Sequence, residues 1–186
     1  MSADTAAPPL VVDLDGTLSR TDLLMECFWK GMGAVPLETL AIALRDFRDR
    51  ARLKRNLGAL APVDVTTLPL RDEVLHLIDT ARASGREVLL VSGGTEALVE
   101  EFAGRRGPFT DVLASDGETN LTRENKAARL VERFGAEGFD YVGDSRDDIP
   151  VWKVARKAYV AAPRPGFTAQ LSREGIDAEP LGESWR

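Results

Sequence analysis

The sequence predicts an α/β fold, a doubly wound parallel sheet with a small helical cap inserted after the first strand. Short apolar segments alternate with helix-length segments from residue 71 onward, whereas residues 19–70 show helical spacing without a strand candidate. We therefore expect an α/β core formed by residues 1–18 and 71–186, and a helical cap formed by residues 19–70. A chain of 186 residues has room for one ordinary core and a small appendage, which argues against two full domains.

The core is expected to contain five buried strands joined by helices. Each strand segment is apolar and stops at Gly, Asp or Pro, and the third is expected to turn near Asp116 and Gly117. Because ligands bind beyond the carboxyl ends of such strands, the polar residues that follow them are the candidate site. The expected strands are 10–14, 88–92, 111–114, 140–143 and 158–162, and the expected helices are 71–84, 95–104, 124–134 and 147–157. One short helix and one last extended segment are expected after Pro163.

The cap is expected to be helical and to lie over the strand ends as a lid. Its apolar residues recur at helical spacing, in the two sets Leu24, Cys27, Phe28 and Leu40, Leu44, Phe47.

Composition excludes several classes of function. A formal charge of −6 argues against a broad nucleic-acid surface. One cysteine, Cys27, and one histidine, His76, cannot build a disulfide framework or a zinc site, and His76 lies opposite the apolar face of its helix. The first residues lack the pattern of a secretory leader, and no stretch is apolar enough for a membrane span, so we expect a cytoplasmic protein.

Two carboxylates end the first strand. Asp13 and Asp15 are two residues apart on an extended segment, so both side chains face one pocket, and Gly16 lets the backbone turn there. Repulsion between two negative charges this close moves the pKa values of the two carboxylates apart. One carboxylate then stays ionised as a nucleophile or metal ligand, and the other is available as a proton donor. The alternative is a strand-end turn in which Asp caps the amides that follow.

Two further segments supply groups that suit a phosphate. Ser92, followed by Gly93, offers a hydroxyl and an unhindered amide, although Ser92 or Thr95 could equally cap the next helix. Lys126 lies near the start of a helix expected to begin at Thr122, where its ammonium could reach the pocket, but a solvated lysine has the same pattern.

The fourth strand ends in an acidic segment. Asp144, Asp147 and Asp148 follow Gly143, and a few oxygen ligands with room for water and a phosphate favour Mg²⁺. An acidic helix N-terminus explains Asp147 and Asp148 equally well, but it does not explain Asp144 at a strand end.

Taken together, these residues resemble the four motifs of the haloacid dehalogenase superfamily, in order and across nearly the whole chain. The motif-like segments are Asp13–Leu18, Val91–Gly94, Lys126 and Gly143–Asp148. The resemblance implies a Rossmann-like core with a cap between the first and second motifs. It also implies that Asp13 is a nucleophile forming an aspartyl-phosphate and that Asp15 is a general acid and base.

The same resemblance implies the binding roles. Ser92, Gly93 and Lys126 would hold the phosphoryl group. Asp13, Asp144 and the backbone carbonyl of Asp15 would bind Mg²⁺, with Asp148 supporting the metal and Asp147 close enough to contest that role.

The second aspartate narrows the implied activity. Dehalogenases of this superfamily lack it, so Asp15 favours hydrolysis of a small-molecule phosphate monoester. Phosphoserine-like, sugar-phosphate and isoprenoid-linked substrates all stay open. Segments 8–18, 21–24 and 114–117, with Asn120, also look similar to the phosphatase-like domain fused to UbiA-type membrane prenyltransferases. The alternative function is therefore a non-catalytic or regulatory domain that partners such a prenyltransferase. A phosphate-receiving signalling domain fits less well, because it has no helical lid.

Basic charge is concentrated in the cap. Residues 45–55 hold six cations and two anions, a charge of +4 in a chain of −6, so the other residues sum to −10. A solvated helix with Arg45/Asp49 and Asp46/Arg50 pairs is one interpretation. The other is a lid that attracts an anionic substrate or an anionic membrane surface. Glu26, Trp29 and Lys30 are candidates for contacting the leaving group, with Trp29 equally suited to the core.

Overall fold

A computed structural model of the chain describes residues 7–115 and 120–182. The turn expected at Asp116 and Gly117 lies outside the described residues. Among the helices within the described ranges, none has both the length and the apolar character needed to cross a bilayer.

Six strands form one sheet in which every pair is parallel, in the order β3-β2-β1-β4-β5-β6. The last extended segment expected from the sequence is β6, which pairs with β5. The strand order reverses at β1, which lies between β2 and β4, and this is the place where open α/β sheets bind ligands. The strands are β1 (Leu10–Asp13), β2 (Val88–Thr95), β3 (Asp111–Ser115), β4 (Asp140–Gly143), β5 (Lys157–Ala161) and β6 (Ala178–Leu181).

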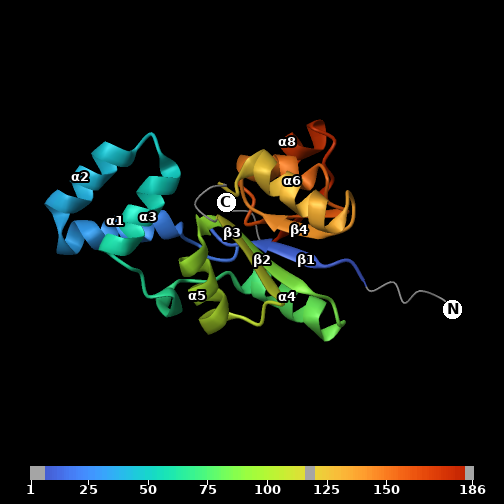
Figure 1. The fold of residues 1–186 in the computed structure, drawn as a ribbon. Helices are drawn as coiled ribbons and strands as arrows, with labels where there is room; N and C mark the ends of the chain where they lie inside the picture. The colour runs from blue at the N-terminus through green and yellow to red at the C-terminus, as the bar shows by residue number, and fades with distance from the viewer. Residues whose placement is uncertain (1–6, 116–119, 183–186) are drawn as a thin grey trace.

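Helices cover both faces of the sheet, which confirms the doubly wound architecture (Figure 1). α4 (Asp72–Ala83) and α5 (Glu96–Arg106) pack on one face, and α6 (Arg123–Phe134), α7 (Ile149–Trp152) and α8 (Phe167–Arg173) pack on the other. The central strand β1 is buried on both sides. Leu10 and Val12 lie in the apolar cluster beneath α4 and α5, and Val11 lies in the cluster beneath α6, α7 and α8.

Two elements differ from the expectation. The helix expected over 147–157 is a 3₁₀ turn, η2 (Arg146–Asp148), followed by the single turn of α7, because the chain must leave the helix before β5 begins at Lys157. The strand expected to stop at Gly93 runs on to Thr95, with an irregular register against β3 between Val91 and Thr95.

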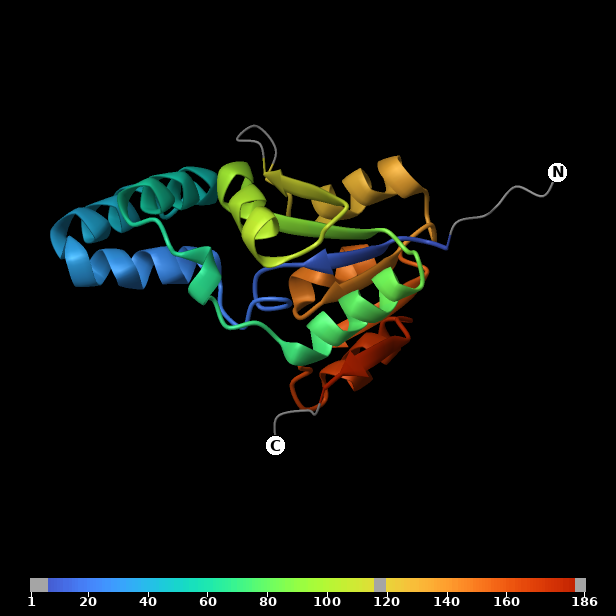
Figure 2. The same cartoon turned by 90° about the horizontal axis from the view of Figure 1, so that it is seen from below.

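The cap consists of α1 (Leu23–Ala34), α2 (Pro36–Asp46), α3 (Arg50–Leu60) and a 3₁₀ turn, η1 (Val65–Thr67). Asp22 caps the N-terminus of α1, since its carboxylate accepts hydrogen bonds from the amides of Leu24 and Met25. Figure 2 shows the three helices lying together beyond the carboxyl ends of the strands, as a lid would.

The two segments that join the cap to the core lie side by side. Ser19 and Leu70 form an antiparallel bridge. The Arg20 amide donates to the Pro69 carbonyl at 2.8 Å, and the Arg71 amide donates to the Leu18 carbonyl at 3.0 Å. The cap therefore leaves and re-enters the core at one place.

Only part of the expected apolar face of the cap is buried. Cys27 belongs to the core, and Leu24 and Phe28 pack against it. The second set is largely open to solvent, with Leu40, Leu44 and Phe47 46%, 67% and 61% exposed. A core position for Trp29 was wrong, because its side chain is 64% exposed.

The expected ion pairs of the basic stretch, Arg45/Asp49 and Asp46/Arg50, do not form. α2 ends at Asp46, so residues four apart across this point are no longer on one helix. Asp46 is instead buried and pairs with Arg45 at 2.8 Å and Arg52 at 3.0 Å. The Arg45 hydrogen bond, with help from Asn56, holds the pKa of Asp46 well below its usual range. This carboxylate ties the end of α2 to α3.

Candidate active site

A buried ion pair forms the centre of the site at the end of β1. The ammonium of Lys126, from the first turn of α6, donates to Asp13 Oδ1 at 2.6 Å. Both residues are 6% exposed. Lys126 also donates to the Tyr141 hydroxyl at 3.1 Å, so the strand β4 helps to aim it at Asp13.

Three carboxylates meet beside this ion pair. Oxygens of Asp13, Asp144 and Asp148 all lie within 4.8 Å of one another. The Thr17 hydroxyl donates to Asp13 Oδ2 at 3.1 Å and approaches Asp144 Oδ1 at 3.4 Å. Hard carboxylate oxygens in this number suit a divalent cation such as Mg²⁺.

Asp148, and not Asp147, belongs to this carboxylate cluster. Asp148 accepts hydrogen bonds from the Tyr141 hydroxyl at 2.6 Å and from the amides of Asp144 and Ser145 at 3.1 and 3.2 Å. Asp147 points elsewhere, with a side chain that is 54% exposed and pairs with Arg123 at 2.6 Å.

Glycine is required at two points where backbone passes close to the carboxylates. Gly16 has a φ of +77°, and a Cβ there would lie 2.6 Å from Asp144 Oδ2. A Cβ on Gly143 would lie 2.6 Å from Asp148 Cγ. These two glycines let Asp144 and Asp148 approach the end of β1.

Asp15 is held apart from the carboxylate cluster, against the cap. Its Oδ2 accepts from the Ser92 hydroxyl at 2.9 Å, and its Oδ1 accepts from the amide of Leu23 at 2.9 Å. The Gly94 amide in turn donates to Ser92 Oγ at 2.8 Å. Since Leu23 is the first residue of α1, the position of Asp15 is coupled to the cap.

Burial changes the proton affinity of the acidic groups. It raises the pKa of Asp13 to about 8 against the opposing charge of Lys126, and it raises the pKa of Asp15 as well. Burial and the neighbouring Asp148 raise the pKa of Asp144 to about 6. Burial disfavours charged Lys126, but the carboxylates of Asp13 and Asp148 outweigh it and raise the pKa of Lys126. A divalent cation among these carboxylates would favour their ionised forms.

The sequence did not single out Lys54, which reaches the site from the cap. Its ammonium donates to the Gly93 carbonyl at 2.6 Å. Burial lowers the pKa of Lys54, opposed by the charges of Asp15 and Asp22. The basic stretch pointed to this part of the cap, but nothing in the sequence distinguishes the cation that faces the core from those that face solvent. Tyr141 was missed too, because its strand pattern is that of an ordinary buried position.

A cavity of about 180 Å³ lies between α3 and the core, next to Lys54. Its lining combines residues of the cap with residues at or just after the carboxyl ends of β2 and β3. These residues are Ala51, Lys54, Arg55, Gly93, Thr95, Glu96, Ser115 and Asn120.

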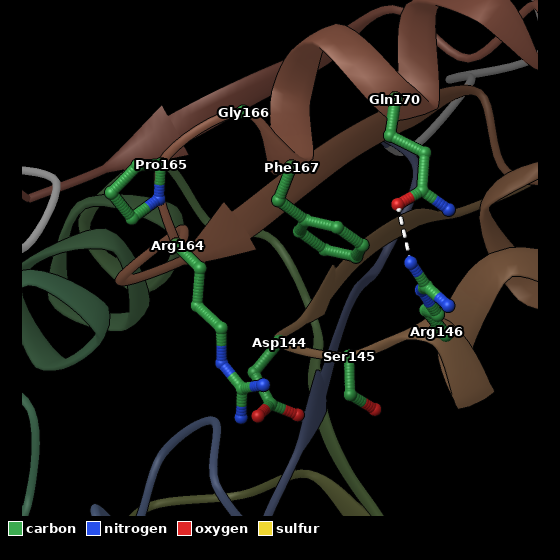
Figure 3. Close-up of a pocket in the computed structure, with 8 residues that line it drawn as sticks. All are labelled: Asp144, Ser145, Arg146, Arg164, Pro165, Gly166, Phe167 and Gln170. Carbon is green, nitrogen blue, oxygen red and sulfur yellow. Dashed lines mark hydrogen bonds between the residues drawn. The ribbon is translucent and has the colours of Figure 1, made fainter.

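A second cavity, of about 430 Å³, opens beside Asp144. Figure 3 shows Arg164 extending toward Asp144 and the Phe167 ring lining the wall. Arg146 is held at the other end of this cavity by a 2.9 Å hydrogen bond to Gln170.

The expected leaving-group contacts Glu26, Trp29 and Lys30 line neither cavity. Lys30 instead donates to the Pro62 carbonyl at 2.5 Å, which ties α1 to the segment after α3. Helical spacing placed these residues on α1, but it did not show which side of α1 faces the core.

Residues 10–153, which contain all of these groups except the part of the second cavity formed by residues 164–170, match the model of a family described as haloacid dehalogenase-like hydrolase. The chain belongs to this family. Family membership agrees with the resemblance seen in the four sequence motifs and with the helical cap inserted after β1.

A curated relative and several solved structures extend this result. An uncharacterised protein of Sinorhizobium fredii, y4nM, is 34% identical over 173 residues, covering 93% of this chain and 33% of its own length. The chain thus spans about a third of that relative. A protein of unknown function from Bordetella pertussis Tohama I has a TM-score of 0.69 at 20% identity, covering 94% of this chain and 99% of its own. A phosphoserine phosphatase in its apo form has a TM-score of 0.65 at 18% identity, covering 96% and 95%. At these identities the two structures show a shared fold.

Proposed function

We propose that this member of the haloacid dehalogenase-like hydrolase family is a Mg²⁺-dependent phosphatase that hydrolyses a small-molecule phosphate monoester. The observation that carries the proposal is the position of Asp13, buried at the end of β1 with Lys126 on one side and Asp144 and Asp148 on another. A carboxylate so placed can meet a phosphoryl group whose negative charge is balanced from several directions.

Asp13 and Asp15 divide the chemistry between them. Asp13 attacks phosphorus, forming an aspartyl-phosphate as the bond to the ester oxygen breaks, and Asp15 gives its proton to that leaving oxygen. Asp15 then takes a proton from the water that hydrolyses the intermediate, which regenerates both carboxyl groups. The raised pKa of Asp15 supports this role, because an acid must hold its proton until the leaving oxygen needs it.

Ser92, Gly93 and Lys126 would hold the phosphoryl oxygens. Lys126 contributes a fixed positive charge. The Ser92 hydroxyl donates a hydrogen bond to Asp15. We expect this hydroxyl to donate either to Asp15 or to a phosphoryl oxygen when substrate is bound.

The carboxylate cluster fits Mg²⁺ in its donor chemistry. Asp13, Asp144 and the backbone carbonyl of Asp15 would hold the ion, and Asp148 would orient Asp144 through the backbone amide it binds. When bound, Mg²⁺ supplies positive charge that neutralises the phosphoryl group and keeps the carboxylates ionised.

A second candidate is a non-catalytic or regulatory domain within a larger assembly, such as a partner of a membrane prenyltransferase. The specific observation in its favour is that the chain matches only a third of the relative y4nM. The buried arrangement of Asp13, Lys126 and Asp144 favours the enzyme, since a domain that only binds has no need of a nucleophile aimed by a lysine. A cytoplasmic location, where Mg²⁺ and phosphorylated metabolites are at hand, is part of the same proposal.

Phosphate release from the purified chain with Mg²⁺ tests the function. A generic aryl phosphate and a panel of phosphorylated metabolites are the substrates, and the Asp13→Asn variant is the blank. Release that disappears in the variant supports the phosphatase. A folded chain that binds Mg²⁺ but releases no phosphate from any substrate would favour the binding domain.

A further inference from the structure

An apolar stripe, formed by Leu37, Leu40, Leu44 and Phe47, runs along one side of α2. The spacing of three, four and three residues places the four side chains on one face of the helix. They are 83%, 46%, 67% and 61% exposed. Met25 and Trp29, on α1, are the other exposed large apolar side chains in the described part of the chain, so the core contributes none. Ordinary scatter of surface hydrophobic residues does not explain such a concentration.

Unpaired cations lie where the stripe ends. The Arg48 guanidinium is 5.2 Å from the centre of the Phe47 ring, and Arg50 begins α3 two residues later. Both are exposed, and neither has a carboxylate within 4.0 Å among residues 7–115 and 120–182. The buried Asp46 is already paired with Arg45 and Arg52, so it does not offset Arg48 and Arg50.

We propose that the apolar stripe and the adjoining Arg48 and Arg50 dock this protein onto the surface of an anionic lipid bilayer. Leu37, Leu44 and Phe47 would enter the boundary between headgroups and acyl chains, and the two guanidinium groups would bind lipid phosphates. Apolar residues alone would accept many partners, and it is the charge beside them that selects an anionic surface.

The distribution of charge also orients the molecule. Residues 45–55 carry +4 while the rest of the chain carries −10, so an anionic membrane attracts this end of the cap and repels the core. A second copy of the chain is a poorer occupant of the stripe, because it would bring the same cations, Arg48 and Arg50, to the contact rather than an anionic surface.

Vesicle sedimentation tests the proposal with the full chain. We expect binding to vesicles of phosphatidylcholine mixed with phosphatidylglycerol, little binding to phosphatidylcholine alone, and release as salt is raised. The charge variant is Arg48→Glu with Arg50→Glu, and its matched control is Arg82→Glu with Arg173→Glu, two exposed core arginines. The apolar variant is Leu37→Gln with Leu44→Gln, which keeps a good helix former at both positions.

Both cap variants should lower the affinity for the mixed vesicles by about tenfold or more, and the core control should leave it near that of the unaltered chain. Circular dichroism establishes that each variant is folded. No binding to the mixed vesicles, equal losses in the cap and core variants, or a concentration-dependent dimer that the apolar variant abolishes without any vesicle binding would each overturn the proposal.

Discussion

The ammonium of Lys126 lies 2.6 Å from the carboxylate of Asp13, although 113 residues separate them in the chain. Asp13 ends the central strand, and Lys126 comes from a helix that covers one face of the sheet. Taking both charges out of water is costly, and their attraction must offset much of that cost. The pair is therefore explained better by chemistry at Asp13 than by stability.

Asp13→Asn should abolish turnover while leaving the protein folded. The amide keeps the size of the side chain and can still accept a hydrogen bond from Lys126, but it cannot attack phosphorus. We expect the rate of phosphate release to fall by about 10³-fold or more. Thermal unfolding checks that the variant is intact, and substantial remaining activity would show that Asp13 is not the nucleophile.

Asp148→Asn and Asp147→Asn form a matched pair, because the two residues are neighbours in different surroundings. Asp148 accepts three hydrogen bonds inside the site, so its replacement should lower the free energy of unfolding by about 1–3 kcal/mol and weaken Mg²⁺ binding. Asp147 forms one exposed ion pair, worth about 0–1 kcal/mol. Calorimetric titration with Mg²⁺ and thermal unfolding measure both effects. Equal effects of the two substitutions would contradict this assignment.

EDTA should remove the activity, and Mg²⁺ should restore it. Mg²⁺ should also raise the unfolding temperature, because it relieves the repulsion among Asp13, Asp144 and Asp148. Asp144→Asn should reduce this thermal shift, which provides a readout independent of catalysis. Undiminished turnover after metal removal would take Asp144 out of its proposed role.

Without metal, the protein should lose stability as pH rises. The folded-state pKa of Asp13 is about 8 and that of Asp144 is about 6, both above the ordinary value of 3.8. At a pH between 3.8 and these raised values, the folded chain therefore binds more protons than the unfolded chain. The stabilising contribution is complete below about pH 4 and is lost as pH rises through 6 and 8. Unfolding temperatures measured with EDTA should show this decline, and saturating Mg²⁺ should suppress it, since the metal binds the ionised carboxylates. A flat profile with EDTA would argue against the raised pKa values.

Lys54→Met should raise the KM for substrates whose leaving group carries an additional negative charge by about tenfold or more. The effect on the KM of an aryl phosphate, whose aryl group carries no charge, should be smaller. The reason is that Lys54 faces the cavity between α3 and the core. Lys30→Met is the control, because Lys30 is also a cap lysine bound to a backbone carbonyl but lines neither cavity. Steady-state kinetics that show the same KM in both variants would place the substrate elsewhere.

Much of the core and of the site could be predicted from the sequence, because each expected strand is an apolar segment that stops at a polar residue, glycine or proline. Asp13, Ser92 and Asp144 each follow an apolar segment, and parallel topology brings the carboxyl ends of those segments to one edge of the sheet. Lys126 could be placed near the start of a helix, but its burial against Asp13 depends on how α6 packs.

The cap was harder to predict, because helical periodicity shows that a face is apolar without showing what covers it. Leu44 and Phe47 have the spacing of core residues, yet both side chains are largely exposed. The ion pairs of Asp46 were missed for a related reason, since they depend on where α2 ends and how α3 returns beside it.

The bridge between Ser19 and Leu70 means that the cap is a closed loop of chain with a common base. Between these two residues the chain can be lengthened, shortened or exchanged for another segment without changing the distance from β1 to α4. The strand ends that hold Asp13 and Asp144 would stay where they are. Such an architecture makes the graft of a foreign lid onto this sheet a practical experiment, provided that the new lid supplies an amide to Asp15 where Leu23 now does.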